Sequence, residues 1–471
     1  MVVNPDAGVT LHRQIYQEWR NGILTGRFRR GDRVPSSREL AATLGVSRST
    51  VTEAYDQLVA EGYLESVHGS GTYVCRHIPD ELSGARRAPA NGLATGVSIR
   101  ISRYGERLRD DLRSTPVGPG VIRFSSGRPD LEQFPFRLWR KLLARHLRQA
   151  RPEMFDYAEE SAGYEPLRRE VAASLARSRA VRCTFEQVII VNGSQQSLDL
   201  CARLLLEPGE VVAMEDPGYP GAQRVFRAYG TKIRPVRVDQ EGIVVRDLGH
   251  RARLVYITPS HQFPTGVSMS LARRLELIEW AQRSGALLIE DDYASEYRYS
   301  GPPLPALQSL ARDVPVIYVG TFSKIMFPGL RIGYAVVPAQ LAQQFIRAKW
   351  MSDRQTPVLE QAALADFIRE GHLERHIRRM RRLYGRRREA LVDALARHFG
   401  DRAKIAGDAA GMHVLVRFDD PEVVRRVGKN RIQAINAGLF YLHNPAKNEL
   451  VLGFAGLGER SIREGIRRLA S

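Results

Sequence analysis

The sequence predicts an α/β protein in which a large domain with a mostly parallel sheet follows a small helical domain. From Val121 onward, short apolar runs such as QVIIV, ARLVYIT and VPVIYVG alternate with amphipathic stretches, which is typical of β-α units. Before residue 78, short helical patterns end in a glycine-rich turn, HGSGTYV. Residues 78–118 are rich in Ala, Arg, Gly, Pro and Ser, so we expect domains at 1–77 and 119–471 joined by this linker.

The size and composition of the chain limit the classes of protein to consider. Its 471 residues suffice for two or three domains. No window approaches eighteen consecutive apolar residues and the N-terminus does not resemble a secretory signal, so we expect a cytoplasmic protein without a membrane span. Cys75, Cys183 and Cys201 are widely spaced, which indicates neither a disulfide framework nor a zinc site, and no metal is predicted.

The formal net charge of +18 favours a polyanionic partner, because Lys and Arg displace the counterions that condense on phosphates. Heavy use of Arg by a GC-rich genome explains the same excess equally well. Most of the excess lies beyond residue 120, whereas residues 1–80 are close to neutral. Charge alone therefore does not locate a DNA-binding domain.

The N-terminal domain is expected to hold three helices followed by a β-hairpin. LHRQIYQEWRNGILTG spaces its apolar residues for one face of a helix. In RELAATLGVSRSTVTEAYDQLV, Ser37 can cap a short helix, Gly45 makes the turn, and Ser47 can cap the next helix. YLESVHGSGTYV then predicts two strands around a glycine turn. The buried face of the third helix is expected to carry Val51, Ala54, Tyr55 and Leu58.

The exposed N-terminal end of the third helix is a candidate recognition surface, because such an end meets base edges and phosphates in a major groove. A small helical module without a nucleic-acid role is the alternative. The segment RVPSSRELAATLGVSRSTVTEAYDQLVAEGYLESVHGSGTYV, however, resembles the GntR family of winged helix-turn-helix regulators almost throughout. The resemblance implies double-stranded operator DNA as a partner. It implies DNA contacts from Arg38, Arg48, Ser49, Thr50, His68 and Gly69.

The strongest chemical motif is TFSKIMFPGLRIGY, which follows an apolar strand. Partial burial of Lys324 there lowers the pKa of its amine and prepares it to form a Schiff base. Arg331 follows a Pro-Gly turn and suits bidentate capture of a phosphate, to which the Thr321 hydroxyl can also donate. The alternative, a surface lysine near an arginine, does not account for the flanking FPGLRIGY.

Three upstream motifs complete a site for a phosphorylated aldehyde. ALLIEDDY ends a strand in Asp291, which can pair with a protonated pyridine nitrogen, and Tyr293, which can reach the ring hydroxyl. EDPGYPG can bring Tyr219 to a ring face for stacking. In NGSQQSLDL a glycine turn opens a helix whose amides can hold the phosphate, at Gly193, Ser194 and Gln195. The alternative for ALLIEDDY is a strand-end cap, and the alternative for NGSQQSLDL is a plain strand-to-helix turn.

Together these motifs resemble fold-type I pyridoxal phosphate enzymes, specifically the aspartate aminotransferase superfamily, over roughly residues 121–471. The order of phosphate turn, stacking aromatic, PTG loop, acid with tyrosine, then lysine is the order of that superfamily. A GntR-like domain before such a body is the architecture of MocR-type regulators. The resemblance implies pyridoxal 5'-phosphate as the cofactor, in a Schiff base with Lys324, and a head-to-tail homodimer. It also implies that Tyr157 crosses the dimer to the partner's phosphate.

Two positions depart from the aminotransferase pattern. The enzymes carry Asn before PTG, where it bonds the ring oxygen, whereas SHQFPTG has Phe263, so His261 or Gln262 would have to substitute. The enzymes also bind the substrate carboxylate with an Arg where NELVLGFAGL has Val451, an apolar residue without donors. Either another residue binds a carboxylate, or the effector lacks one held in this way. The candidates for such a residue are Arg128 and His413.

The run FIREGHLERHIRRMRRLYGRRREAL predicts a helix with one apolar stripe and a strongly basic outer face. A solvated helix is the simpler interpretation. The alternative is a second DNA contact on a bent operator. It predicts that replacing Arg378, Arg379, Arg381 and Arg382 with Glu weakens binding to a long operator but not to a half-site.

The sequence therefore predicts a pyridoxal phosphate-dependent transcription regulator of MocR type that senses an amine, an amino acid or a vitamin B6 species. One rival is a true aminotransferase with a regulatory DNA-binding head, against which Phe263 and Val451 count, so that at most half-reactions or weak transaminase activity are expected. The other is a DNA-binding module whose large domain has lost the cofactor and serves only to dimerise, against which the intact Lys324 and Asp291 count.

Overall fold

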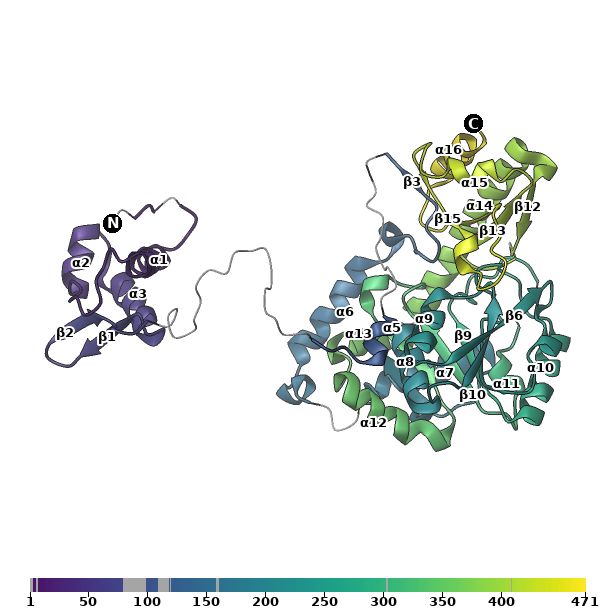
Figure 1. Ribbon diagram of the computed structural model, residues 1–471, viewed down its shortest axis with the longest axis horizontal. Helices are drawn as coiled ribbons and strands as arrows, with labels where there is room; N and C mark the ends of the chain where they lie inside the picture. Colours follow the sequence, from purple (N-terminus) through teal and green to yellow (C-terminus); the bar gives the residue numbers. More distant parts are fainter. Residues whose placement is uncertain are drawn as a thin grey trace. The chain divides into compact units, whose positions relative to one another are not determined.

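The computed structural model describes residues 3–5, 7–78, 99–108, 118, 120–157, 161–301, 304–407 and 409–471. They form two compact units, residues 1–100 and residues 101–471 (Figure 1). Within the described residues, no helix combines the length and the apolar character that a membrane crossing requires. Each unit has a hydrophobic core of its own, and the core of the first unit is smaller.

The N-terminal unit packs three helices against a two-stranded hairpin around Trp19, Val51 and Leu58, all buried. Ser47 caps the third helix through a 3.2 Å hydrogen bond from the Thr50 amide, as expected. The predicted cap at Ser37 was wrong: Ser36 caps the second helix in a capping box with Glu39, and Ser37 is its first residue. The elements are α1 (Leu11–Leu24), α2 (Ser37–Leu44), α3 (Arg48–Ala60), β1 (Leu64–Val67) and β2 (Gly71–Val74).

An eight-stranded sheet of order β4-β11-β10-β9-β8-β5-β6-β7 forms the centre of the second unit. β11 runs antiparallel to both of its neighbours and β7 runs antiparallel to β6, while the other neighbouring pairs are parallel, so the predicted mostly parallel α/β sheet is confirmed. The strands are β4 (Val188–Val191), β5 (Val211–Asp216), β6 (Lys232–Asp239), β7 (Gly242–Ile243), β8 (Ala252–Ile257), β9 (Leu287–Asp292), β10 (Val316–Thr321) and β11 (Gly333–Val336).

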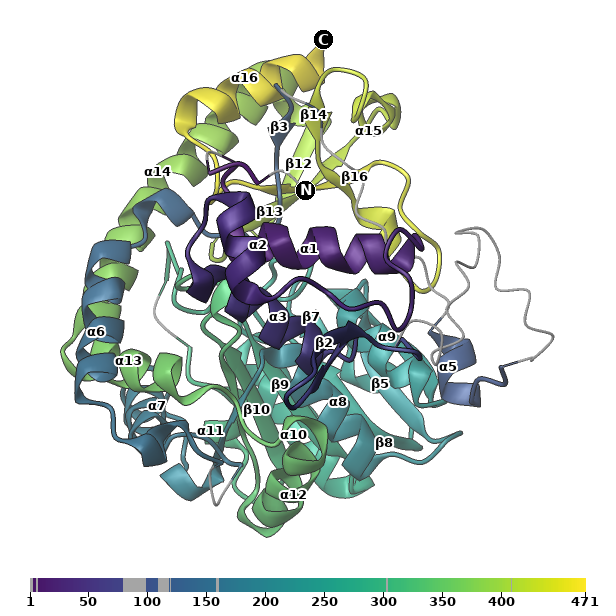
Figure 2. The same ribbon diagram turned by 90° about the vertical axis from the view of Figure 1, so that its left-hand side faces the viewer.

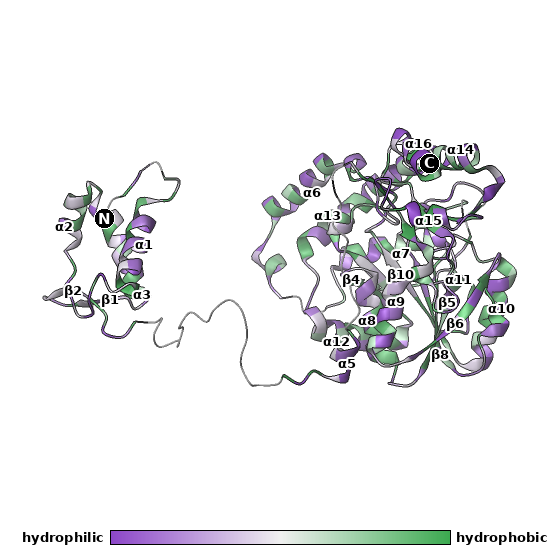
Figure 3. Cartoon of the chain, turned by 45° about the horizontal axis from the view of Figure 1, so that its top comes forward, coloured by the Kyte–Doolittle hydropathy of each residue, from purple (hydrophilic) through white to green (hydrophobic). Residues whose placement is uncertain are grey.

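Helices cover both faces of this sheet, because strand side chains alternate between the faces and are apolar on each. Ile189 and Val191 of β4 pack with α8 and α12, whereas Val188 and Ile190 pack with α7 and α13. Figure 3 shows apolar strands inside and polar helix surfaces outside. The helices are α6 (Phe136–Gln149), α7 (Glu165–Arg179), α8 (Ser194–Leu205), α9 (Pro220–Ala228), α10 (Leu271–Ser284), α11 (Leu307–Leu310), α12 (Ala342–Asp353) and α13 (Val358–Arg369).

A smaller C-terminal lobe of the same unit is built on a four-stranded sheet of order β12-β13-β16-β15. The long helix α14 begins beside α13 and reaches this lobe, where it packs on α16 (Figure 2). Phe124, from the start of the unit, is buried in the core of the lobe. The elements are β3 (Ile122–Arg123), α14 (His372–Phe399), β12 (Ala403–Ala406), β13 (His413–Phe418), α15 (Glu422–Arg426), β14 (Ile432–Gln433), β15 (Ile435–Asn436), β16 (Glu449–Gly453) and α16 (Glu459–Ala470).

Candidate cofactor site and nucleic-acid interface

A cavity of about 1100 Å³ opens where β8, β9 and β10 end and α8 begins. Carboxyl ends of parallel strands are the usual place for ligands in open α/β sheets. Residues from segments more than a hundred positions apart meet there, and nine of the ten predicted cofactor residues line the cavity. They are Gly193, Ser194, Gln195, Tyr219, Asp291, Tyr293, Thr321, Lys324 and Arg331.

Lys324 lies in the loop that follows β10 and is largely buried. Burial lowers the pKa of its amine, Arg128 and Arg331 lower it further, and the negative charge of Asp291 opposes them. Gly127 leaves the space that the amine occupies, since a Cβ there would stand 3.0 Å from Nζ. Burial therefore raises the fraction of neutral amine, which is the form that attacks a carbonyl carbon.

Asp291 presents one free acceptor at the end of β9. Its Oδ2 accepts a 2.8 Å hydrogen bond from the Tyr256 hydroxyl, and its Oδ1 is buried without a hydrogen-bond partner. Burial raises the pKa of this carboxyl to about 6, and the bond from Tyr256 opposes the rise. The Tyr293 hydroxyl is likewise buried and unpartnered. A buried acceptor and a buried hydroxyl without partners fit the ring nitrogen and ring hydroxyl of pyridoxal 5'-phosphate.

The opposite end of the cavity is suited to a phosphate. Gly193 caps α8 with φ 95°, and a Cβ on it would stand 2.9 Å from Nη2 of Arg331. The guanidinium of Arg331 thus lies against the glycine, donates to the Asn192 carbonyl and stays exposed. The first amides of α8 point the positive end of the helix toward the same place. Thr321 is buried, and its hydroxyl oxygen accepts a 3.2 Å hydrogen bond from the Ser323 amide.

Of the two tyrosines predicted to stack on the ring and to reach a partner's phosphate, only Tyr219 lines the cavity of its own chain. Tyr219 is half-buried in the wall of the cavity, edge to face with Phe263 at 5.8 Å between ring centroids. Tyr157 does not line the cavity of its own chain. It is 73% exposed, with the Arg354 guanidinium 4.6 Å above its ring.

Neither His261 nor Gln262 takes the position of the missing asparagine. The Gln262 amide donates to Glu215 and to the Pro217 carbonyl at 2.8 Å, away from the cavity lining. His261 is buried beside His413, and burial holds its pKa well below the usual range. Of His261, Gln262 and Tyr293, only Tyr293 lines the cavity.

Val451 is fully buried in β16 and packs with Leu415, Phe440 and Ile435. Ile435 and Phe440 also line the cavity, so this end of it is apolar. His413 is held by Ser126 and the Pro264 carbonyl, and burial lowers its pKa to about 4, so it is a neutral ring that cannot pair with a carboxylate. Arg128 is exposed and lowers the pKa of the Lys324 amine, so it is the charged one of the two predicted candidates. It does not line the cavity, whereas Arg107, Arg224 and Arg227 do.

Several residues of the site were not anticipated. Tyr256 lies within an apolar run and Glu215 ends another such run, which are weak signals in a sequence. Glu215 is buried, accepts a 2.6 Å hydrogen bond from the Thr258 hydroxyl, and burial raises its pKa to about 7. The short helix α5 (Arg103–Arg107) lies within the range expected to be a linker, and its Tyr104 and Arg107 line the outer part of the cavity.

In the N-terminal unit, the candidate DNA contacts lie on α2, at the start of α3 and in the hairpin turn. Arg38, Arg48, Ser49, His68 and Gly69 are exposed. Thr50 is half-buried, and its hydroxyl lies 2.7 Å from that of Ser47, so part of its hydrogen-bonding capacity is used by the helix cap. Gly69 has φ 75°, which suits the tight turn between β1 and β2.

Both units match known protein families. Residues 11–74 match the bacterial regulatory proteins of the gntR family, and residues 119–468 match the aminotransferases of class I and II. Over its full length the chain is 41% identical to the probable rhizopine catabolism regulatory protein MocR of Rhizobium meliloti, of which it covers 95%. It is 32% identical to the pyridoxine biosynthesis transcriptional regulator PdxR of Corynebacterium glutamicum, over 98% of this chain and 96% of that protein.

Among solved structures, the chain is similar to LysN, the alpha-aminoadipate aminotransferase of Thermus thermophilus, in complex with N-(5'-phosphopyridoxyl)-L-leucine. The TM-score is 0.71 at 31% identity, over 79% of this chain and 96% of that one. The second unit thus has the fold-type I architecture, and that fold implies pyridoxal 5'-phosphate.

Proposed function

The chain belongs to the MocR-type transcriptional regulators, which join a GntR-family winged helix-turn-helix to an aminotransferase-like domain, and we propose that its second unit binds pyridoxal 5'-phosphate at Lys324 and responds to a small amine or a vitamin B6 species. The observation that carries the proposal is the buried, unpartnered Oδ1 of Asp291 in a cavity that also holds Lys324 and Arg331. Leaving that acceptor unpaired costs stability, which a ring N–H would restore.

Each part of the cofactor has a group to hold it. Asp291 would pair with the ring nitrogen, Tyr293 with the ring hydroxyl and Tyr219 with the ring face. The phosphate would lie between Arg331 and the start of α8, where Gly193, Ser194, Gln195 and Thr321 meet it.

When bound, pyridoxal 5'-phosphate supplies an aldehyde carbon that condenses with amines and a ring that accepts electrons. Burial lowers the pKa of the Lys324 amine and so raises its unprotonated fraction, and a positive ring nitrogen beside Asp291 would keep that carboxyl ionised. Lys324 would hold the aldehyde carbon, and an amine effector would compete with Lys324 for that position.

The effector is proposed to lack an α-carboxylate bound as in the aminotransferases. Val451 and its neighbours Ile435 and Phe440 make that end of the cavity apolar, and His413 is neutral. An acidic group of the effector could meet Arg128 or the lining arginines Arg107, Arg224 and Arg227. The relatives' names include rhizopine catabolism and pyridoxine biosynthesis, which supports an amine or a vitamin B6 species as the class to test.

We further propose a cytoplasmic homodimer of head-to-tail type that binds two operator half-sites. The exposed ring of Tyr157, which lines no part of its own cavity, supports a contact with the partner's phosphate. On DNA, Arg38, Arg48, Ser49 and Thr50 would meet the major groove, and His68 and Gly69 the backbone. Effector binding would then change DNA binding, because the effector would have different affinities for two arrangements of the dimer.

The test is an absorbance titration of the full chain with pyridoxal 5'-phosphate, followed by borohydride reduction and mass spectrometry. Wild-type protein should acquire a visible band and a covalent adduct on the peptide of Lys324, and Lys324→Ala should acquire neither. Both proteins should still bind operator DNA. A wild-type protein that binds DNA but gains no band or adduct would overturn the proposal.

A true aminotransferase is the second candidate function, because Lys324 and Asp291 line the same cavity and Oδ1 of Asp291 is unpartnered. The sequence is 33% identical over 74% of this chain to the 2-aminoadipate transaminase of Thermus thermophilus. Release of a keto acid over many cycles from an amino acid and the holoprotein would favour it, whereas one turnover or none agrees with a regulator.

A further inference from the structure

A second cavity, of about 470 Å³, lies next to the loop that carries Lys324. Side chains alternate along this loop: Thr321, Ser323 and Lys324 line the cofactor cavity, whereas Phe322 and Ile325 line the second one. The cavities therefore share a wall, and the cofactor chemistry uses only one side of it.

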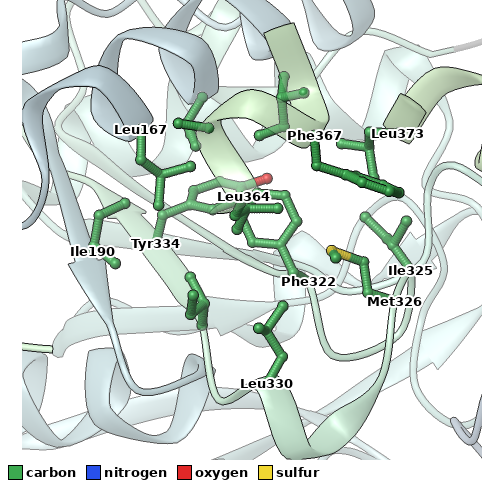
Figure 4. Close-up of a cluster of buried hydrophobic side chains, with 14 of the residues drawn as sticks. Leu167, Ile190, Phe322, Ile325, Met326, Leu330, Tyr334, Leu364, Phe367 and Leu373 are labelled. Carbon is green, nitrogen blue, oxygen red and sulfur yellow. The ribbon is translucent and has the colours of Figure 1, made fainter. Parts of the chain in front are cut away.

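The floor of the second cavity is apolar. Phe322, Ile325, Tyr334 and Leu373 belong to the buried cluster between the sheet and helices α7, α13 and α14, and Figure 4 shows them converging there. Together with Leu175 they line the cavity. Such a floor suits an aromatic ring or a short aliphatic chain.

The rim of the cavity carries more cations than anions. Arg177, Arg298, Arg378 and Arg381 line it with only two carboxylates, Glu296 and Glu374. A fifth cation there, Arg179, is already neutralised by Asp292 at 2.9 Å.

Three of these arginines form no ion pair with a carboxylate among the described residues. Arg298 lies 3.3 Å from the Ser268 hydroxyl through Nη1, and its Nε is buried without a partner. Arg381 donates only to the Glu296 carbonyl, and Arg378 has no hydrogen bond or ion pair within the part of the chain that the structure describes. Guanidinium groups left in this way are free to bind an anion in bidentate geometry.

We propose that this cavity is a second ligand site, for a small amphipathic anion whose apolar group rests on Phe322 and Ile325 and whose carboxylate or phosphate meets Arg298 and Arg378. The volume lies within the range of small-molecule sites, at its lower end. The surplus of positive charge selects for an anion, and the apolar floor selects against a fully hydrated one.

Such a ligand would act on the cofactor site through two shared segments. Phe322 and Ile325 flank Lys324, and Arg298 lies in the loop that follows Asp291 and Tyr293. Occupation of one cavity then changes the affinity of the other, and the coupling is reciprocal. The long helix α14, which supplies Arg378 and Arg381, continues into the C-terminal lobe.

The test is calorimetric titration of the full chain, in saturating pyridoxal 5'-phosphate, with two probes, phenyl phosphate and 3-phenylpropionate. We expect saturable binding of at least one probe, weakened about fivefold or more by Arg298→Gln and by Arg378→Gln. Arg382→Gln, on the same helix but outside the cavity lining, is the matched control and should bind as wild type. The neutral benzyl alcohol and inorganic phosphate should both bind more weakly.

Arg378 is exposed, so its variant is expected to fold even if Arg298→Gln does not, and thermal unfolding checks both. No saturable binding of either probe at millimolar concentration overturns the proposal. So does binding that both Arg298→Gln and Arg378→Gln leave unchanged, or that Arg382→Gln weakens as much as they do. Tighter binding of phenyl phosphate would indicate a phosphate ligand, and tighter binding of 3-phenylpropionate would indicate a carboxylate.

Discussion

The Tyr256 hydroxyl donates a 2.8 Å hydrogen bond to Oδ2 of Asp291, while Oδ1 of the same carboxylate has no partner. Burial raises the pKa of Asp291 to about 6, and Tyr256 opposes that rise because its hydrogen bond stabilises the ionised form. A hydroxyl donor thus sets the charge of the group proposed to hold the cofactor ring.

Cofactor affinity should therefore depend on the protonation of Asp291. Below about pH 6 the carboxyl is mostly protonated and loses its attraction for a positive ring nitrogen, so affinity for pyridoxal 5'-phosphate should fall as the pH falls. The measurement is the ratio of Kd values for Asp291→Asn and wild type across this range, in which the titration of the cofactor's own phosphate cancels. Tyr256→Phe should shift the midpoint to higher pH. A ratio that does not change with pH would contradict the assignment.

The contact between Gly193 and Arg331 can be tested with a matched glycine. Gly193 and Gly209 both have φ 95°, but a Cβ would meet Arg331 at 2.9 Å only at position 193, and nothing within 4 Å at position 209. Both alanine variants should lose similar stability from backbone strain. Only Gly193→Ala should also displace the guanidinium and weaken cofactor binding, by roughly tenfold for one charge-assisted contact. Equal cofactor affinity of the two variants would remove Arg331 from the phosphate site.

Glu215 should make stability fall as the pH rises. Its pKa of about 7 in the folded protein exceeds its unfolded value, so the folded state binds the extra proton, and the resulting stabilisation is lost between about pH 4 and 7. Glu215→Gln removes this dependence, and its amide oxygen can still accept the hydrogen bond from the Thr258 hydroxyl. Relative to that variant, wild type should lose up to about 3 kcal/mol of unfolding free energy by pH 8. Urea denaturation of both proteins at several pH values is the measurement, and parallel curves would contradict the prediction.

Arg48 should contribute to DNA binding without contributing to stability. It is exposed at the start of α3, and the only hydrogen bond of its side chain among the described residues is a long one of 3.3 Å to the Ser37 hydroxyl. Arg48→Ala should weaken operator binding, and the salt dependence of binding should fall by about one charge if the contact is to phosphate. Arg13→Ala, exposed on α1, is the control and should bind as wild type. Unchanged affinity of Arg48→Ala would exclude it from the interface.

The basic face of α14 offers a narrower test of a second DNA contact than the sequence suggested. Arg379 and Arg381 donate to the carbonyls of Gln133 and Glu296, and Arg378 and Arg381 line the second cavity. Arg382 is exposed and has neither role. If the large unit touches a bent operator, Arg382→Glu should weaken binding to a long operator fragment and not to a half-site. Equal loss on both fragments, or none, would count against the contact.

The sequence alone was sufficient for the fold class of each unit, and nine of the ten residues that it singled out for a cofactor line one cavity. Lys324, Asp291 and Arg331 follow strands at recognisable turns, and Ser47 caps its helix, because these features depend on neighbours a few residues apart. Reasoning from neighbouring residues gave the wrong helix cap at Ser37. Two adjacent serines can cap α2, and the capping box with Glu39 favours Ser36.

Only the tertiary structure decided which distant side chains share one environment. Tyr256 meets Asp291 because β8 and β9 are parallel neighbours, and Gln262 turns to the buried Glu215 instead of the cavity. Val451 is enclosed by an apolar cluster drawn from β13, β15 and the loop after it. The second cavity arises where α7, α14 and the loops after β9 and β10 meet. Burial, pKa and the pairing of charges depend on such long-range contacts, which local sequence patterns do not specify.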